Sequence, residues 1–343
     1  MKRLWIARLS LSLLATLLLL EVAARLYYHV RHRQPLRLSA QELIYFYYPE
    51  LRLVPEDDCA ECWDVLVLGG STLHPAFSDT ALRLHDALQA RTSRRVRIIN
   101  LAVPSQSSLD SWHKYRQLSR RRFQLVLIYD GFNELRANNV PPSLWREDYG
   151  HYAWYDEINF WVRHPRLARS GWMAPFYLRH VLVKIEDELF HRKVPRHDPD
   201  PSWVPYGRDI KTAGPLRRHV QQMVDLARTK EEPLVLMTVA AHVPRDYSLA
   251  KFRAGTLDYA KPPGRPIELW GDPAHIRAGL AAHNQIIRAL AATHQLPIFD
   301  VAQEMTRHPA DFVDVCHFSP EGSARFAERL LVALERQGLL PPP

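Results

Sequence analysis

Five short runs of apolar residues, rich in leucine, isoleucine and valine, recur along the chain between much longer mixed stretches. Strands buried on both faces of a parallel sheet show such near-continuous runs, whereas half-exposed strands alternate apolar and polar residues. We therefore predict five buried strands in one parallel sheet, at residues 64–68, 96–101, 125–129, 233–240 and 296–300.

The stretches between these runs carry apolar residues at the three- and four-residue spacing of amphipathic helices. Strands that alternate with helices indicate helical crossovers covering both faces of the sheet. The pattern therefore predicts an α/β fold, a flavodoxin-like three-layer sandwich with a central parallel sheet of about five strands. The expected helices lie at residues 80–91, 108–121, 216–229, 274–294 and 320–337.

Two proline-rich segments interrupt this alternation, at about residues 140–207 and 241–273. Both begin just after a predicted strand, at the sheet edge where open α/β proteins bind ligands. Either extra helices covering apolar surface or a lid and substrate wall would account for them. The first segment holds five of the nine tryptophans, at positions 145, 154, 161, 172 and 203.

An uncharged, leucine-rich run occupies residues 9–20 near the N-terminus. Trp5 and Tyr27 bracket it, and 22 helical steps between them span about 33 Å at a rise of about 1.5 Å per residue. That length matches a hydrocarbon core with aromatic residues at its two edges. We therefore expect an N-terminal membrane helix.

The flanks of this run leave two interpretations open. Glu21 and Arg25 are four residues apart and can pair on a helix near the membrane interface, whereas the small residues at 22–24 also suit signal cleavage. We assign residues 1–33 to an anchor or uncleaved signal, 34–58 to a linker and 59–338 to the main domain. Three basic residues precede the run and three follow it, so charge alone does not orient the chain.

The composition excludes a disordered chain, a collagen-like repeat and a membrane protein with many spans, and the charge distribution argues against a nucleic-acid partner. The hydrophobic content of 47% and charged content of 24% are those of a globular domain. The net charge of +8 invites a nucleic-acid interpretation, but residues 1–33 hold six basic residues and one acidic residue. The other 310 residues therefore share only +3. Because the excess flanks the apolar run, we expect no nucleic-acid partner.

Cys59 and Cys62 form a C-x-x-C pair just before the first predicted strand. A thioredoxin-type pair would follow a strand, and a zinc site would need two further ligands that the neighbourhood lacks. A local disulfide in an exported domain and two buried thiols remain equal alternatives. We expect no metal and no cofactor.

A Gly-Gly-Ser-Thr block, residues 69–72, directly follows the first predicted strand. The glycines permit a sharp turn, so the hydroxyl of Ser71 can project above the sheet as a nucleophile. A phosphate-binding loop or a plain helix cap would show the same residues.

Asp314 and His317 lie three residues apart, just before the last predicted helix. On a turn, the carboxylate can meet one ring nitrogen and leave the other free to accept a serine proton. A surface aspartate beside a helix-flanking histidine is the alternative. Ser319 and Pro320 have the residue types of the cap and first position of the following helix.

Two further polar blocks follow the second and third predicted strands. Asn133 can point an amide N–H at a developing oxyanion. The block at residues 100–106 (NLAVPSQ) can supply a backbone N–H to the same position.

These four blocks, in this order and strand context, resemble those of the SGNH (GDSL-type) serine hydrolases, over about residues 60–135 and 275–335. The resemblance implies that Ser71 is the nucleophile, His317 the general base and Asp314 its orienting partner. It also implies an oxyanion hole formed by Asn133 and the backbone N–H of Ser105. The family has glycine where this chain has Ser105, so that role requires Ser105 to adopt the same φ.

The resemblance further implies an esterase of the membrane-anchored bacterial type, with its catalytic domain outside the cytoplasm. Its expected substrate is an ester-linked acyl group of a carbohydrate or lipid. An O-acyltransferase with the same triad and a catalytically silent glycan- or lipid-binding relative are the alternatives. No pattern in the sequence addresses the oligomeric state.

Overall fold

The computed structural model describes residues 2–33, 36, 40–56, 59–196, 200–305 and 308–342. The chain divides into two compact units. We call Met1–Arg52 with Leu144–Arg196 the N-terminal unit, and Leu53–Ser143 with His197–Pro343 the sheet unit.

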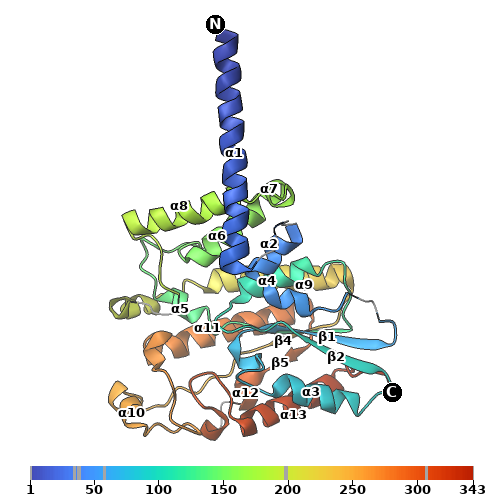
Figure 1. The fold of residues 1–343 in the computed structure, drawn as a ribbon. Helices are drawn as coiled ribbons and strands as arrows, with labels where there is room; N and C mark the ends of the chain where they lie inside the picture. The colour runs from blue at the N-terminus through green and yellow to red at the C-terminus, as the bar shows by residue number, and fades with distance from the viewer. Residues whose placement is uncertain are drawn as a thin grey trace. The chain divides into compact units, whose positions relative to one another are not determined.

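The sheet unit is built on five parallel strands in the order β2-β1-β3-β4-β5 (Figure 1). This confirms the predicted flavodoxin-like α/β fold, in which the strand order reverses beside the first strand and opens a crevice there. The strands are β1 (Cys62–Gly69), β2 (Arg95–Asn100), β3 (Leu125–Tyr129), β4 (Leu234–Met237) and β5 (Ile298–Phe299).

Helices cover both faces of this sheet (Figure 1). One layer contains α3 (Thr80–Gln89), α12 (Val301–Met305) and α13 (Pro320–Arg336), and the other contains α4 (Ser108–Gln117), α9 (Ala213–Lys230) and α11 (Pro273–His294). Shorter elements are α5 (Leu135–Asn138), α10 (Leu249–Ala254), η2 (Ser71–Leu73), η3 (Pro201–Arg208), η4 (Ile267–Leu269) and η5 (Pro309–Asp311).

Burial explains why the strand runs are so apolar. All eight residues of β1 and all five of β3 are buried, because helices pack on both sides of them. Burying one such aliphatic side chain contributes about 1.5–3 kcal/mol. The β1–β3 pair is therefore a rigid base for the loops that leave its carboxyl ends.

The N-terminal unit is helical and has an aromatic core. The Phe176 ring lies 4.7 Å from that of Tyr28 and 5.3 Å from that of Trp161. Part of the segment expected as a linker forms α2 here. The elements are α1 (Lys2–His32), α2 (Ala40–Tyr47), η1 (Pro49–Leu53), α6 (Ala153–Arg163), α7 (Pro165–Arg169) and α8 (Ala174–Phe190).

Helix α1 is long and apolar enough to cross a membrane over Trp5–His32, with a mean hydropathy of 1.9 in its most apolar window. The expected ion pair is present within it, because Arg25 Nε lies 2.6 Å from Glu21 Oε1. Of the two alternatives for Cys59 and Cys62, the structure contains the disulfide.

Candidate active site

Ser71 begins the 3-10 turn η2, two residues after the end of β1. A Cβ at Gly69 would lie 2.7 Å from the carbonyl oxygen of Tyr129, so glycine permits β1 and β3 to approach closely here. Ser71 is 9% exposed, so its hydroxyl lies near the surface without being free in solvent. The turn therefore presents the hydroxyl at the carboxyl edge of the sheet, as the sequence predicts.

The structure brings Ser71, His317 and Asp314 together. His317 Nε2 lies 2.7 Å from Ser71 Oγ, and His317 Nδ1 lies 2.7 Å from Asp314 Oδ2. Ser71 and His317 are 246 residues apart in the chain. This chain of contacts can carry a proton from the hydroxyl to the imidazole while the carboxylate holds the ring.

The carboxylate of Asp314 is held on both oxygens. Oδ1 accepts hydrogen bonds from the backbone N–H groups of Cys316 at 2.9 Å and His317 at 2.8 Å. Burial acts to raise the pKa of Asp314, but the hydrogen bond and charge of His317 outweigh it and hold that pKa below its ordinary value. The group therefore stays ionised at neutral pH and can stabilise an imidazolium.

The loop that carries His317 is fixed by the start of α13. Ser319 caps this helix as predicted, because its hydroxyl accepts a hydrogen bond from Gly322 N–H at 3.0 Å. A Cβ at Gly322 would lie 2.1 Å from Asp311 O, so the loop and helix require glycine there. Thr72 Oγ donates to Cys316 O at 3.4 Å and links this loop to the one bearing Ser71.

Phe77 is a component that the sequence did not indicate. Its ring stacks on that of His317 at 4.8 Å and 20°, and it remains 46% exposed. No residue pattern marks this contact, since it depends on how the loop after η2 folds back. The stacking restricts the tilt of the imidazole and covers one of its faces.

Asn133 follows β3 and lies beside the Ser71 turn. Its side-chain Nδ2 donates to Gln106 O at 2.8 Å, and a Cβ at Gly70 would lie 2.6 Å from the same nitrogen. Ser105 has φ of 64°, which lies in the left-handed region that favours glycine. Ser105 therefore adopts the backbone conformation for which a glycine is favoured, and the SGNH-type family has glycine at this position.

Lys114 is a second residue that the sequence did not indicate. It is fully buried on α4, where Nζ donates to Leu101 O and, at 2.5 Å, to Gln106 Oε1. A buried ammonium is costly unless it is fully hydrogen-bonded. By bonding to both Leu101 and Gln106, Lys114 therefore fixes the loop between β2 and α4.

Two buried acids, Asp130 and Glu134, belong to the loop after β3. Burial, followed by repulsion from Glu134, raises the pKa of Asp130 above its ordinary value. Burial likewise raises the pKa of Glu134, although its Oε1 accepts the Ser108 N–H at 2.6 Å. Glu134 stands where the resembling family has aspartate, and here it ties the loop to α4.

Two cavities flank the Ser71 hydroxyl and the His317 ring. A space of about 10 Å³ is bordered by Ser71, Gln106 and Asn133, which is room for about one water-sized atom. A larger cavity of about 420 Å³ is lined by Phe77, Lys261, His317 and others. Because Lys261 belongs to the 241–273 segment, that segment forms part of a wall beside the histidine.

In the described part of the chain, possible metal-ligating atoms of Asp314, Cys316 and His317 lie within 4.8 Å of one another. Both Asp314 oxygens and both His317 ring nitrogens already have hydrogen-bond partners. These atoms of Asp314 and His317 are thus engaged in hydrogen bonds within the protein.

Solved structures to which the chain is similar were found at low sequence identity. A GDSL-like lipase from Bacteroides thetaiotaomicron is 15% identical with a TM-score of 0.43, covering 86% of this chain and 98% of its own. A lipase/acylhydrolase from Enterococcus faecalis is 14% identical (TM-score 0.41, 82% and 98%). The acetylxylan esterase Axe2 from Geobacillus stearothermophilus is 14% identical (TM-score 0.42, 79% and 94%).

None of the curated proteins matches the chain. The sequence profile of the GDSL-like Lipase/Acylhydrolase family matches residues 67–325, which include the blocks around Ser71, Asn133 and His317. Membership makes the chain a hydrolase of the acylhydrolase and esterase class, and it confirms the resemblance seen in the sequence. With three quarters of its length matched, the chain belongs to the GDSL-like lipase/acylhydrolase family.

Proposed function

We propose that this protein is a serine esterase that cleaves carboxylic esters through Ser71, His317 and Asp314. The observation that carries the proposal is the 2.7 Å contact between His317 Nε2 and Ser71 Oγ. The Asp314 carboxylate on the other ring nitrogen directs the lone pair of Nε2 toward the hydroxyl. Nucleophile, base and orienting group thus stand in the order that acyl transfer requires.

In the first step, Ser71 Oγ attacks the ester carbonyl carbon and its proton passes to His317 Nε2. A C–O bond forms, and the carbonyl electron pair moves onto the oxygen. The intermediate then collapses, the ester C–O bond breaks, and the leaving alkoxide takes the proton from His317. The Asp314 carboxylate stabilises the imidazolium throughout.

In the second step, His317 accepts a proton from water as the water oxygen attacks the acyl-enzyme. Collapse of the second intermediate breaks the bond to Ser71 Oγ and returns the proton to it. The products are the free acid and the restored enzyme.

The oxyanion formed in both steps needs donors that are already in position. We assign this role to the Asn133 side chain and the backbone N–H of Ser105. The small space bordered by Ser71, Gln106 and Asn133 supports the assignment for Asn133. The left-handed φ of 64° at Ser105 supports the second donor, since it is the conformation a glycine would bring there.

We further propose that α1 is a single-pass anchor in a bacterial inner membrane, with the catalytic domain outside the cytoplasm. Residues 1–33 would form the anchor, 34–58 the connection and 59–338 the hydrolase domain with its two inserts. The Cys59–Cys62 disulfide supports an oxidising compartment for that domain.

For the substrate, we propose an ester-linked acyl group on a carbohydrate or lipid. The cavity beside His317 places the aromatic ring of Phe77 near the charged groups of Asp79 and Lys261. Such a mixed lining can receive an apolar acyl chain or a hydroxylated alcohol. No cofactor is required by the proposed chemistry.

A fluorophosphonate probe tests the nucleophile directly, because it phosphorylates an activated serine. We expect covalent labelling of the wild type and none of Ser71→Ala. Ser323→Ala is the matched control, because Ser323 is also buried but its hydroxyl meets Ser78 rather than an imidazole. Equal labelling of wild type and Ser71→Ala would refute the assignment.

Hydrolysis is separated from transfer by an ester assay with and without a polyol acceptor. We expect free acid as the main product in both reactions. Accumulation of acylated polyol at the expense of free acid would instead identify an acyltransferase. Absence of turnover with intact probe labelling would contradict hydrolysis of the esters tested.

A further inference from the structure

Helix α1 has two parts with different surroundings. Every residue from 5 to 19 is exposed, whereas Glu21, Ala24 and Tyr28 are buried against the rest of the N-terminal unit. These three residues recur at the spacing of one helix face. The helix is therefore free over its first half and docked over its second, as Figure 1 shows.

The free part is too short to cross a bilayer. From Trp5 to Leu20 is 15 steps, or about 23 Å, whereas the hydrocarbon core is about 30 Å thick. If Trp5 marks one edge of the core, as interfacial tryptophans do, the other edge falls about five residues beyond Leu20. Elements packed against Glu21 and Arg25 would then lie at the membrane surface.

Helix α8 is the element packed there. The Glu21 carboxylate accepts hydrogen bonds from the Met173 N–H at 2.8 Å and the Ala174 N–H at 2.7 Å, and so caps the start of α8. Arg25 Nη2 donates to Gly171 O at 2.8 Å in the same turn. These contacts hold the first turn of α8 at the level of Glu21.

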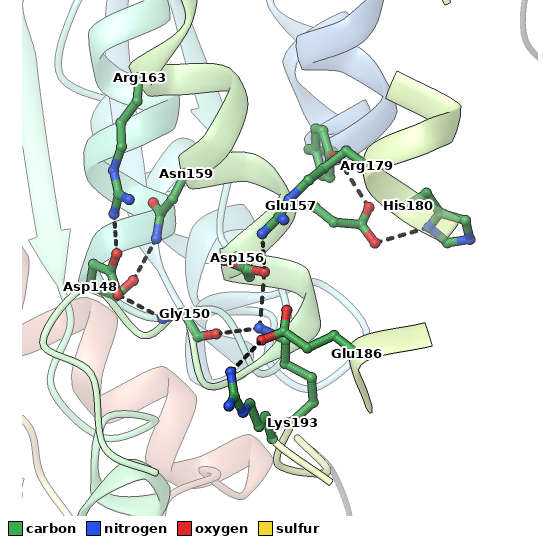
Figure 2. Close-up of polar contacts among 12 residues, drawn as sticks. Asp148, Gly150, Asp156, Glu157, Asn159, Arg163, Arg179, His180, Glu186 and Lys193 are labelled. Atoms are coloured by element: carbon green, nitrogen blue, oxygen red, sulfur yellow. Dashed lines mark hydrogen bonds and ion pairs between the residues drawn. The ribbon is translucent and has the colours of Figure 1, made fainter. Parts of the chain in front are cut away.

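The buried face of α8 is turned away from the free part of α1. Phe176 packs on Tyr28, which lies seven residues, or about 10 Å, further along α1 than Glu21. On the next turn, Arg179 pairs with Asp156, and His180 Nδ1 lies 2.9 Å from Glu157 Oε1 (Figure 2). Both acids belong to α6, so this face of α8 is fixed against α6.

The opposite face of α8 carries an exposed apolar stripe. Its members are spaced four, three and four residues apart, which places them on one side of the helix. Their exposure is high for large aliphatic side chains, from 42% to 66%. We call this set the α8 stripe: Leu178, Leu182, Ile185 and Leu189.

We propose that the α8 stripe is a membrane-binding surface that lies in the lipid interface beside the anchor. The inference rests on the proposed role of α1 as a membrane helix. In Figure 1, α8 runs across α1 rather than along it, so a membrane-spanning α1 would leave α8 in the plane of the bilayer surface.

A helix in this plane buries its apolar face at the boundary between headgroups and acyl chains. Exposed Arg166 and Arg169 on α7, on the same unit, can meet lipid phosphates. The stripe would thus limit the tilt of the N-terminal unit on the membrane.

Site-directed fluorescence in the full-length protein tests this proposal. Single cysteines replace Leu14 on free α1, Leu182 in the stripe, Glu188 on another side of α8 and Leu249 in the sheet unit. Cys59 and Cys62 are joined and Cys316 is buried, so an added thiol is the reactive one. Each is labelled with an environment-sensitive fluorophore and reconstituted in phosphatidylcholine–phosphatidylglycerol vesicles.

We expect nitroxide lipids to quench the labels at positions 14 and 182, and aqueous iodide to quench those at positions 188 and 249. Lipid quenching at position 14 with iodide quenching at position 182 would overturn the proposal and leave the anchor intact. A label at position 182 that neither agent quenches would show a protein partner or second copy instead. Loss of lipid quenching at position 14 would remove both the anchor and the inference, without affecting fluorophosphonate labelling of Ser71.

Discussion

The two loops that flank Ser71 are built in different ways. The loop of residues 311–319 holds His317 through its own short-range bonds, from Asp314 to the backbone N–H groups of Cys316 and His317. The side bearing Asn133 depends on distant residues, since His283 Nδ1 meets Gly131 O and Asn133 Nδ2 donates to Gln106 O. Lys114 in turn holds the side chain of Gln106. The first arrangement is a local motif, whereas the second is a product of the whole sheet unit.

In the proposed mechanism, this difference separates the residues for proton transfer from those for anion stabilisation. The Ser71–His317–Asp314 contacts are already at 2.7 Å without substrate. The Asn133 amide, in contrast, donates to Gln106 O in this state. Nδ2 carries two hydrogens, so one can donate to Gln106 O while the other is left for a carbonyl oxygen that enters the small space. Substitutions on the two sides should therefore differ in size and in kind.

The largest effect is expected at Asp314. Asp314→Asn keeps the shape of the side chain but removes the charge that stabilises imidazolium, so kcat should fall about 10⁴-fold. Asp300→Asn is the matched control, because Asp300 also accepts two side-chain partners but lies outside the site. A fall in kcat of similar size in both variants, measured with a chromogenic ester, would contradict the role of Asp314.

On the oxyanion side, Asn133→Ala should lower kcat about 10²–10³-fold with little change in KM, as loss of one donor does. Asn139→Ala is the control, since Asn139 Nδ2 likewise donates to a backbone carbonyl, that of Trp270, at 3.0 Å. Both variants should lose stability, but only the first should lose kcat. Unchanged turnover in Asn133→Ala would remove this residue from the hole.

Substitutions at Ser105 test whether its left-handed backbone conformation is needed for its N–H to stabilise the oxyanion. Ser105→Gly should stabilise the fold by at most about 1 kcal/mol and keep kcat, because glycine adopts positive φ without strain. Ser105→Val should lower both, since a β-branched residue strongly disfavours this region. Glu231 has φ of 55° at the end of α9. Glu231→Gly and Glu231→Val are therefore the matched controls, and they should change only the free energy of unfolding. A normal kcat in Ser105→Val would argue against the backbone N–H of residue 105 as a donor to the oxyanion.

The smallest effect concerns pH. Burial lowers the pKa of His283 to about 4, and its Nδ1 contacts Gly131 O at 2.7 Å, near Asn133. The unfolded chain binds this proton below its ordinary pKa of 6.5, whereas the folded chain excludes it until about 4. This histidine therefore costs folding stability as pH falls through that window.

His283→Gln removes the titration, so the stability advantage of the wild type over this variant should shrink between pH 7 and pH 5. Thermal unfolding of the two proteins at both values measures it. A gap that stays constant or widens toward pH 5 would mean that His283 is protonated in the folded state.

The sequence predicted the sheet because buried strands leave an unmistakable apolar pattern in β1 and β3. The three-residue spacing of Asp314 and His317 allowed their contact but left a surface aspartate as an alternative, so this pairing too was expected from the family resemblance. The meeting of Ser71 with His317 came from the family resemblance, as no spacing along the chain can encode it.

Other features were not accessible in this way. The stacking of Phe77 on His317 and the burial of Lys114 depend on tertiary packing, and an aromatic or a lysine is common on any surface. Glu21 was expected to pair with Arg25 and does so, but its cap on α8 joins residues 152 positions apart. Such contacts leave no local periodicity to detect.

The close packing of Gly322, in the first turn of α13, against Asp311 also bears on the order in which the candidate site is assembled during folding. His317 reaches Ser71 only when α13, which follows the histidine loop, docks beside α3. A chain in which this docking has not yet occurred would have its serine hydroxyl in place but no imidazole to deprotonate it. The time at which Ser71 becomes reactive toward an organophosphorus reagent would thus report when the tertiary structure is complete.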